Sequence, residues 1–295
     1  MPLNEPPVAS PADARGDKPR DDELDLFGLT HLGKVRKENQ DHFLLATVNP
    51  QVVVHASSLS NQGHLPLRGD RLATIMLVAD GVGSGAGGDA SQLTVETITR
   101  YVSTTMRSYH LAGHDTDDGF LEALRAAALE AHEAVRVAAA NAQVRSMATT
   151  LTLAYAVWPW AYVVQVGDSR CYIYWDGVLR QVTRDQTVAQ DLMDEGVLPP
   201  ERAAASPFMH VLASAIGGRE AMPVVTREDI HHRGCVVFLC SDGLTKHVSD
   251  KEIAEHLGAM ESSEQVCRAL LDLALERGGS DNITILAGRA RQVAG

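Results

Sequence analysis

The sequence lacks most features of a secreted or membrane-bound protein. Only four of its 295 residues are cysteines, and none of them forms a CxxC pair. A chain without a disulfide framework is typical of a reducing compartment. No basic and then apolar segment opens the chain, and no apolar run is long enough to cross a bilayer. We therefore predict a cytoplasmic protein that does not bind membranes.

Basic residues are also scarce. The chain has 26 Lys and Arg residues against 38 Asp and Glu residues, which gives a formal net charge of −12. Such a surface repels nucleic acids and anionic lipids on average, so we expect no nucleic-acid partner. The acidic side chains are instead available to bind metal ions.

What the sequence does contain is enough apolar material for one substantial core, at 45% hydrophobic residues. Residues 1–24 are rich in Pro, Asp, Ala and Arg without apolar periodicity, which predicts a flexible tail. No repeat or interior linker divides the remainder. We therefore expect one domain over residues 25–295, and a monomer.

Short apolar segments with β-branched residues alternate with turn signals and predict strands. These segments are 43–48, 73–79, 150–157, 160–166, 171–175, 178–182, 236–239 and 283–286. Asp176-Gly177 suits a tight hairpin turn, which favours antiparallel pairing. Helices are predicted at 89–106 and 116–141, after Ser249 up to Gly258, and after Ser262 up to Gly278. This order favours an α+β layered domain.

Five aspartates stand at the ends of predicted strands. Asp80, Asp168 and Asp242 follow apolar runs and lie next to a glycine, while Asp41 and Asp281 come just before a strand. Any one of them is explained as a turn residue. Strand ends at one rim of a sheet, however, bring distant positions together. Five carboxylates gathered there would repel one another unless cations neutralised them.

All-oxygen ligands favour Mg²⁺ or Mn²⁺ over zinc. A carboxylate that bridges two such ions about 3.5–4 Å apart holds a water between them and aims it at phosphorus. The pattern therefore predicts a hydrolase of phosphate esters. Arg36, five positions before Asp41, is the candidate cation for the phosphate, because a guanidinium forks onto two phosphate oxygens.

Together these motifs resemble the metal-dependent serine/threonine phosphatases of the PP2C (PPM) family, particularly its bacterial branch. The motifs run in the family's order through nearly the whole chain: Arg36-x-x-Asn39-x-Asp41, Val78-Ala79-Asp80-Gly81-Val82-Gly83, Thr149-Thr150, Val166-Gly167-Asp168-Ser169-Arg170, Ser241-Asp242-Gly243-Leu244 and Gly279-Ser280-Asp281-Asn282-Ile283-Thr284. Each is a modest pattern alone, but their order and combination are specific to the family.

The resemblance implies two antiparallel sheets packed face to face, with pairs of helices on both outer faces. It also implies site roles, with two Mn²⁺ or Mg²⁺ ions and a third, weaker site. Asp80 would bridge both ions and Gly81 would add its carbonyl. The other implied roles are a first ion on Asp242 and Asp281, a second on Asp41, a third on Asp168 with Asp242, and the substrate phosphate on Arg36. The implied substrate is phosphoserine or phosphothreonine in the targets of a serine/threonine kinase.

Two departures from the family pattern concern the site. Val82 stands where eukaryotic members have a histidine that serves as general acid, which leaves the proton donor unassigned. Gln40 stands where other members often carry glutamate, which removes one negative charge near Asp41. Residues 187–223 correspond to the family's variable flap, where we expect substrate choice to be determined.

Three alternatives stay open on the sequence. Gly83, Gly85 and Gly88 match the G-x-G-x-x-G pattern of dinucleotide-binding enzymes, but no acidic residue stands about twenty positions beyond. A phosphatase for small phosphate esters would share the same site residues. A regulatory binding module of the same fold would have lost the metal-binding aspartates, whereas this chain keeps them.

Overall fold

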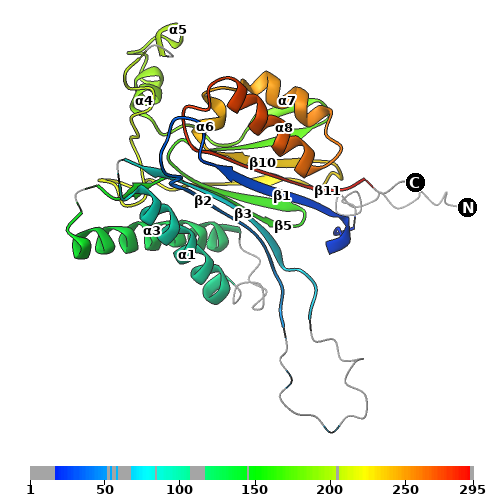
Figure 1. Cartoon of the computed structure of the whole chain (residues 1–295). Helices are drawn as coiled ribbons and strands as arrows, with labels where there is room; N and C mark the ends of the chain where they lie inside the picture. Colours follow the sequence, from blue (N-terminus) through cyan, green and yellow to red (C-terminus); the bar gives the residue numbers. More distant parts are fainter. Residues whose placement is uncertain are drawn as a thin grey trace, which may run out of the picture.

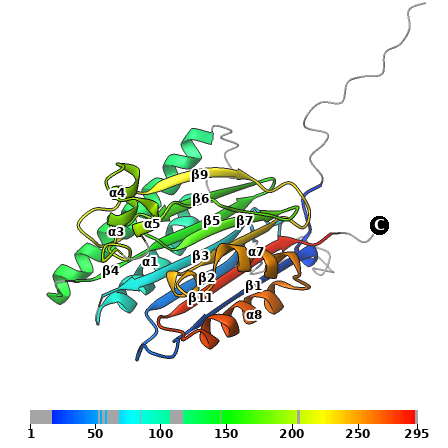
Figure 2. The ribbon, with the colours of Figure 1, turned by 90° about the horizontal axis from the view of Figure 1, so that it is seen from above.

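The apolar runs of the sequence form two antiparallel sheets that stack face to face (Figures 1 and 2). The computed structural model describes residues 17–51, 54, 58, 68–83, 85–106, 117–144, 146–203 and 206–292. Within these ranges one sheet has five strands, in the order β1 (Leu24–His31), β11 (Ile283–Ala290), β10 (Val236–Cys240), β7 (Arg170–Trp175) and β8 (Val178–Gln181). Strand β7 turns into β8 through Asp176-Gly177, both at positive φ as predicted.

The second sheet, with six strands among the described residues, lies against the first. Its order is β2 (Asp41–Val48), β3 (Ala73–Val82), β5 (Leu151–Val157), β6 (Trp160–Val166) and β9 (Val224–Asp229), and the short β4 (Ala148–Thr149) also pairs with β3. Figure 2 shows the strands of both sheets running in similar directions, as in an aligned sandwich.

Helices cover both outer faces of the sandwich (Figure 1). The six-stranded sheet carries α1 (Gly87–Tyr101), which continues as a π-helical turn over Val102–Met106, and α3 (Asp117–Ala142). The five-stranded sheet carries α7 (Asp250–Gly258) and α8 (Ser263–Glu276). The shorter elements are η1 (Asp21–Glu23), α4 (Val188–Asp194), α5 (Pro200–Ala203) and α6 (Asp242–Thr245). The predicted α+β fold, with a pair of helices on each outer face, is confirmed.

Side-chain capping determines where the last two long helices begin. The Ser249 hydroxyl accepts from the backbone N–H of Glu252, whose carboxylate accepts from the Ser249 N–H, so the predicted capping box is confirmed. The Ser262 hydroxyl accepts from the N–H of Gln265 in the same way. Each contact satisfies a donor that the first helical turn leaves unpaired.

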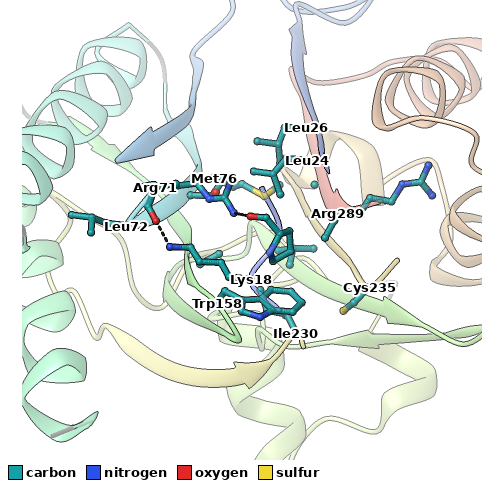
Figure 3. A pocket seen from close by; sticks show the side chains of 16 residues that line it. Lys18, Leu24, Leu26, Arg71, Leu72, Met76, Trp158, Ile230, Cys235 and Arg289 are labelled. Atoms are coloured by element: carbon teal, nitrogen blue, oxygen red, sulfur yellow. Dashed lines mark hydrogen bonds between the residues drawn. The ribbon is translucent and has the colours of Figure 1, made fainter. Parts of the chain in front are cut away.

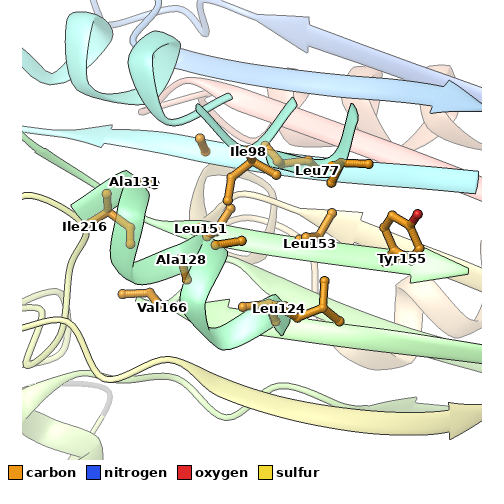
Figure 4. Close-up of a cluster of buried hydrophobic side chains, with 14 of the residues drawn as sticks. Leu77, Ile98, Leu124, Ala128, Ala131, Leu151, Leu153, Tyr155, Val166 and Ile216 are labelled. Atoms are coloured by element: carbon orange, nitrogen blue, oxygen red, sulfur yellow. The ribbon is translucent and has the colours of Figure 1, made fainter. Parts of the chain in front are cut away.

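The buried side chains form three apolar layers, one beneath each helix pair and one between the sheets. Figure 4 shows the layer under α1 and α3, where Leu124, Ala128 and Ala131 of α3 pack over Leu151 and Leu153 of β5. The layer between the sheets joins side chains of both of them, namely Met76, Val78, Ala154, Val163, Cys171, Val237, Leu239 and Leu286. This inner layer fixes the spacing of the two sheets.

The structure differs from the sequence prediction at three places. The predicted tail ended at residue 24, but Asp21–Glu23 form a 3₁₀ turn and Leu24 opens β1, so regular structure begins earlier. Strands β1 and β9 were not predicted. Residues 1–16 of the predicted tail lie outside the described residues, as does most of the connection between β2 and β3.

All four cysteines are free and buried, in agreement with the absence of a disulfide framework. Within the described residues, no helix combines the length and apolar character that a bilayer crossing requires.

Candidate active site

The two sheets bring the five aspartates to one edge of the sandwich. Asp41 opens β2 and lies opposite Asp80 near the end of β3 in the antiparallel register. Asp242 follows the end of β10, while Asp281 precedes the start of its antiparallel neighbour β11, so these two share the same end of the other sheet. A single pocket at this edge is lined by Asp80, Asp168, Asp242 and Asp281. The predicted convergence of distant acidic residues is therefore what the structure shows.

Asp41 lies behind Asp80 and is held by hydroxyl groups. Its Oδ2 accepts hydrogen bonds from Ser241 Oγ at 2.8 Å and from Thr284 Oγ1 at 2.7 Å. Its Oδ1 is buried and receives no hydrogen bond from an N–H or hydroxyl group of the described residues. A buried carboxylate oxygen without a donor is costly, and a cation is a natural partner for it. The residues present therefore fit a divalent ion at this position.

The electrostatics of the cluster also fit cations. Burial, followed by repulsion from Asp41, Asp242, Asp168 and Asp281, raises the pKa of Asp80 well above its usual value. Burial likewise raises the pKa of Asp41 to about 6, although its two hydroxyl donors act against this shift. A nearby cation offsets the free-energy cost of ionising such buried and mutually repelling carboxyl groups. The donor set, which is all oxygen, suits Mg²⁺ or Mn²⁺.

Two basic side chains supply positive charge from within the chain. Lys246 Nζ lies 2.6 Å from Asp242 Oδ2 and 2.6 Å from Asp281 Oδ2. Arg36 Nη2 donates to Asp281 Oδ2 at 2.8 Å, and its Nε lies 2.7 Å from Oδ1. In the described part of the chain, no three His, Cys, Asp or Glu side chains are already arranged as a metal cage. Asp242 and Asp281 instead face these basic groups.

Arg36 lies at the rim of the pocket, where we predicted a phosphate-binding group. Its side chain is 53% exposed while it forks onto Asp281. The hydrogen bond to Asp281 raises the pKa of Arg36, so this guanidinium stays charged. It is therefore a positive group with one side on the acidic cluster and the other open to solvent.

Several residues of the site escaped the sequence prediction. Lys246 stands one helical turn after Asp242, and this i,i+4 spacing was its only sequence signal. Ser241 and Thr284 lie inside the quoted motifs but were given no role. His210, from the flap, lines the pocket with its Nδ1 4.0 Å from Asp242 Oδ2. Asn282 holds the segment before β2, because its Oδ1 accepts from the Gln40 N–H.

Glycines near the aspartates are required by close backbone packing. A Cβ on Gly81 would lie 2.4 Å from the backbone carbon of Gly87, and one on Gly243 would lie 1.9 Å from the carbonyl oxygen of Asn282. Neither distance is possible for a real side chain. These two glycines thus let the backbone pack tightly beside Asp80 and Asp242.

Asp168 is expected to give the metal-free protein a pH-dependent stability. Burial, then repulsion from Asp242 and Asp185, raises the pKa of its carboxyl to about 8. An unfolded chain titrates this group near pH ~3.9, so its contribution to stability is full below that pH and is lost as the pH rises to about 8. In chelator the melting temperature should fall between pH 6 and pH 8. The expected contribution of Asp168 is at most about 1.4 kcal/mol per pH unit.

The variant Asp168→Asn isolates this contribution because its amide does not titrate. Thermal melts in chelator at pH 6, 7, 8 and 9 should show a shallower pH dependence for the variant than for the parent. An identical slope in both proteins would contradict the assignment to Asp168.

A second cavity lies at the opposite end of the sandwich and has a different character. Its walls are mainly apolar side chains of both sheets, including Leu26, Met76 and Val237, and they contain no Asp or Glu. Figure 3 shows Lys18 and Arg71 beside it, with Lys18 bonded to the Arg71 carbonyl. The five aspartates of the candidate site thus lie at the other end of the strands, while the acidic groups near this cavity, Asp21 and Asp25, are bonded to Arg71 and Arg289.

Comparison with known proteins agrees with this site. A sequence profile of the family described as protein phosphatase 2C matches residues 57–277, more than half of the chain. The chain is 35% identical over 216 residues to the serine/threonine protein phosphatase PstP of Mycobacterium tuberculosis, covering 72% of this chain and 40% of PstP. It therefore spans less than half of that relative.

A shorter relative is covered more fully. The serine/threonine phosphatase stp of Listeria monocytogenes is 30% identical over 214 residues, which cover 72% of this chain and 82% of stp. The crystal structure of a PstP catalytic domain in complex with two manganese ions superposes with a TM-score of 0.68 at 29% identity, covering 91% of this chain and 99% of that one. The family profile and the relatives agree, and the chain belongs to the protein phosphatase 2C family.

Proposed function

We propose that this protein hydrolyses phosphoserine and phosphothreonine in other proteins, using two divalent cations. The observation that carries the proposal is the convergence of five aspartates from both sheets beside Arg36, with one buried Asp41 oxygen that receives no N–H or hydroxyl hydrogen bond from the described residues. Its named relatives are serine/threonine phosphatases, and one solved relative contains manganese.

The proposed roles follow from position. Asp80 is paired with Asp41 across β2 and β3 and shares a pocket with Asp168, Asp242 and Asp281, which supports a role in holding both ions together with the Gly81 carbonyl. Asp242 and Asp281 would hold the first ion and Asp41 would serve the second. Asp168, with Asp242, would form the weaker third site. When bound, the ions would lower the pKa of a water molecule and neutralise charge on the phosphate.

The remaining work falls to the protein's own side chains. Arg36 binds the phosphate, because its guanidinium faces solvent at the rim of the acidic cluster and is fixed there by Asp281. Ser241 and Thr284 hold Asp41 in one orientation through its Oδ2, which leaves Oδ1 directed away from them. Val82 has no proton to give, so it does not replace the histidine found at this position in eukaryotic members.

The cellular setting is part of the proposal. The four free cysteines suit the reducing cytoplasm. A single chain supplies all five aspartates and Arg36, so the site needs no second copy and a monomer suffices. The proposed substrates are products of a serine/threonine kinase, which this protein would oppose.

We expect phosphate release from a phosphothreonine peptide to depend on Mn²⁺ or Mg²⁺. Chelator should abolish it and excess Mn²⁺ should restore it, because the carboxylates alone lack a means of activating water. We expect kcat/KM to be about tenfold higher or more on the peptide than on p-nitrophenyl phosphate, a difference of about 1.4 kcal/mol in transition-state binding. The measurement is phosphate release with each substrate.

Two results would count against the proposal. Full activity in chelator would remove the metal-dependent mechanism. A higher kcat/KM on the small ester than on peptides of several sequences would instead point to a phosphatase for small molecules.

A further inference from the structure

Lys246 occupies an unusual place for a lysine. Its Nζ lies between two proposed metal ligands, at 2.6 Å from Asp242 Oδ2 and at 2.6 Å from Asp281 Oδ2. The side chain is only 21% exposed, and the two aspartate side chains are 17% and 16% exposed. These three side chains therefore form a largely buried ion triad. The ion pair between Lys251 and Glu255 on the next helix is different, because the Lys251 side chain is 86% exposed.

The fold itself delivers Lys246 to this place. Asp242 begins α6 directly after β10, and Lys246 caps this short helix with its N–H bonded to the Asp242 carbonyl. One helical turn therefore separates the two side chains and puts them on the same face. Asp281 arrives from the adjacent strand connection before β11. The lysine is thus tied to the same helix as one carboxylate and faces the other.

The charges of the triad strongly favour the ion pairs. Burial alone would lower the pKa of Lys246, but attraction to Asp242 and Asp281 outweighs it and raises that pKa above its usual value. Arg36 and Lys246 together also lower the pKa of Asp281 against the effect of its burial. Two carboxylates and two basic groups therefore neutralise one another within a small volume.

A divalent ion held by Asp242 and Asp281 would compete with Lys246 for the same two carboxylates. An ammonium group at 2.6 Å from both carboxylates and a divalent ion on the same carboxylates repel each other, because both are cations. We propose that Lys246 is a tethered cation which neutralises Asp242 and Asp281 in the metal-free protein and is displaced from them when a divalent ion binds. This inference rests on the proposed metal-dependent function.

Thermodynamic linkage predicts that the loss of Lys246 changes metal affinity and the stability of the metal-free protein in opposite directions. Contacts made only in the metal-free form stabilise that form and weaken ion binding by the same free energy. Removing the ammonium should therefore tighten metal binding and also lower the stability of the metal-free protein. A lysine that contributed only packing would instead lower stability with and without metal alike.

The test is the substitution Lys246→Met, which keeps an unbranched side chain, one atom shorter, and removes its charge. We expect the dissociation constant for Mn²⁺, measured by isothermal titration calorimetry, to fall about tenfold, which corresponds to about 1.4 kcal/mol. In chelator the melting temperature should fall by several degrees, and saturating Mn²⁺ should close most of that gap. Lys251→Met is the matched control, and both of its values should stay at those of the parent.

Several outcomes would decide the matter. Unchanged or weaker Mn²⁺ binding by Lys246→Met overturns the inference, and Lys246→Gln provides the same comparison if the methionine variant does not fold. If Lys246→Met binds Mn²⁺ more tightly but neither it nor the parent releases phosphate from any peptide, the result supports Lys246 as the competing cation and rejects the proposed function. Saturable Mn²⁺ binding and phosphatase activity in the parent, with unchanged affinity in both variants, rejects only the role of Lys246.

Discussion

Replacing Asp80 by asparagine is expected to abolish metal-dependent phosphatase activity, although the variant still folds. Asp80 is paired with Asp41 on its own sheet and shares a pocket with Asp168, Asp242 and Asp281, so it is the carboxylate that we propose would contact both ions. An amide lacks the negative charge that holds two cations together. Losing several kcal/mol of metal-centred stabilisation lowers kcat/KM by about a thousandfold.

The fold of the Asp80→Asn variant should not suffer. Burial, followed by repulsion from the neighbouring aspartates, raises the pKa of Asp80, so a neutral amide avoids both costs in the metal-free protein. We expect an equal or higher melting temperature in chelator, together with weaker Mn²⁺ binding by calorimetry.

Asp176→Asn is the matched control for this prediction. Asp176 lies in the hairpin turn between β7 and β8 at φ 49°, a conformation that asparagine also adopts readily. Its activity and Mn²⁺ affinity should equal those of the parent. An Asp80→Asn protein as fast as this control would refute the mechanism.

Replacing Gly243 by alanine is expected to be among the most damaging single-methyl changes in the chain. The added Cβ would lie 1.9 Å from the carbonyl oxygen of Asn282 and 2.9 Å from its carbonyl carbon, so backbone must move. We expect a loss of about 3 kcal/mol in the free energy of unfolding, or roughly 10 °C in melting temperature. The movement also separates Asp242 from Asp281, so Mn²⁺ affinity should fall as well.

Gly88→Ala supplies the comparison for Gly243→Ala. Gly88 is helical in α1, and its added Cβ would come no closer than 3.7 Å to another atom outside the helix. Alanine favours helix over glycine, so this variant should be as stable as the parent or more stable by up to about 1 kcal/mol. Thermal melts of the two variants side by side test whether close packing, rather than loss of glycine as such, sets the cost. Equal losses would refute the packing argument.

The residue patterns predicted an α+β layered domain and the meeting of its aspartates, because both leave local signals, whereas the two-sheet sandwich was implied by the resemblance to the PP2C family. Apolar runs that end in Asp-Gly mark strand ends, as at Asp80 and Asp242, and antiparallel pairing then brings those ends together. The hairpin at Asp176 was equally local, since two residues at positive φ suffice to define it. Helices with serine caps were found for the same reason.

What the sequence did not reveal depends on partners far along the chain. Strand β1 contains Asp25, which is buried only because the Ser263 N–H and Arg289 bond to it. Strand β9 is an edge strand of alternating exposure with three charged residues, so it has no continuous apolar run. Both segments look like surface loops when considered alone.

Lys246 was missed for a related reason. Its i,i+4 pairing with Asp242 is a common surface pattern, and nothing nearby in sequence shows that Asp281, 35 residues later, closes around the same ammonium group. Ser241 and Thr284 likewise gain their role only when Asp41, more than 190 residues away, packs against them.

The inner apolar layer has a consequence for residues remote from any chemistry. Met76 and Val78 on one sheet pack against Leu239 and Leu286 on the other, and these same sheets carry the two halves of the acidic cluster. The thickness of that layer therefore sets the distance between the two halves of the cluster, which bound ions would have to span. Conservative changes in the sandwich interior are consequently expected to alter metal selectivity, since Mg²⁺ tolerates less variation in ligand distance than larger ions do.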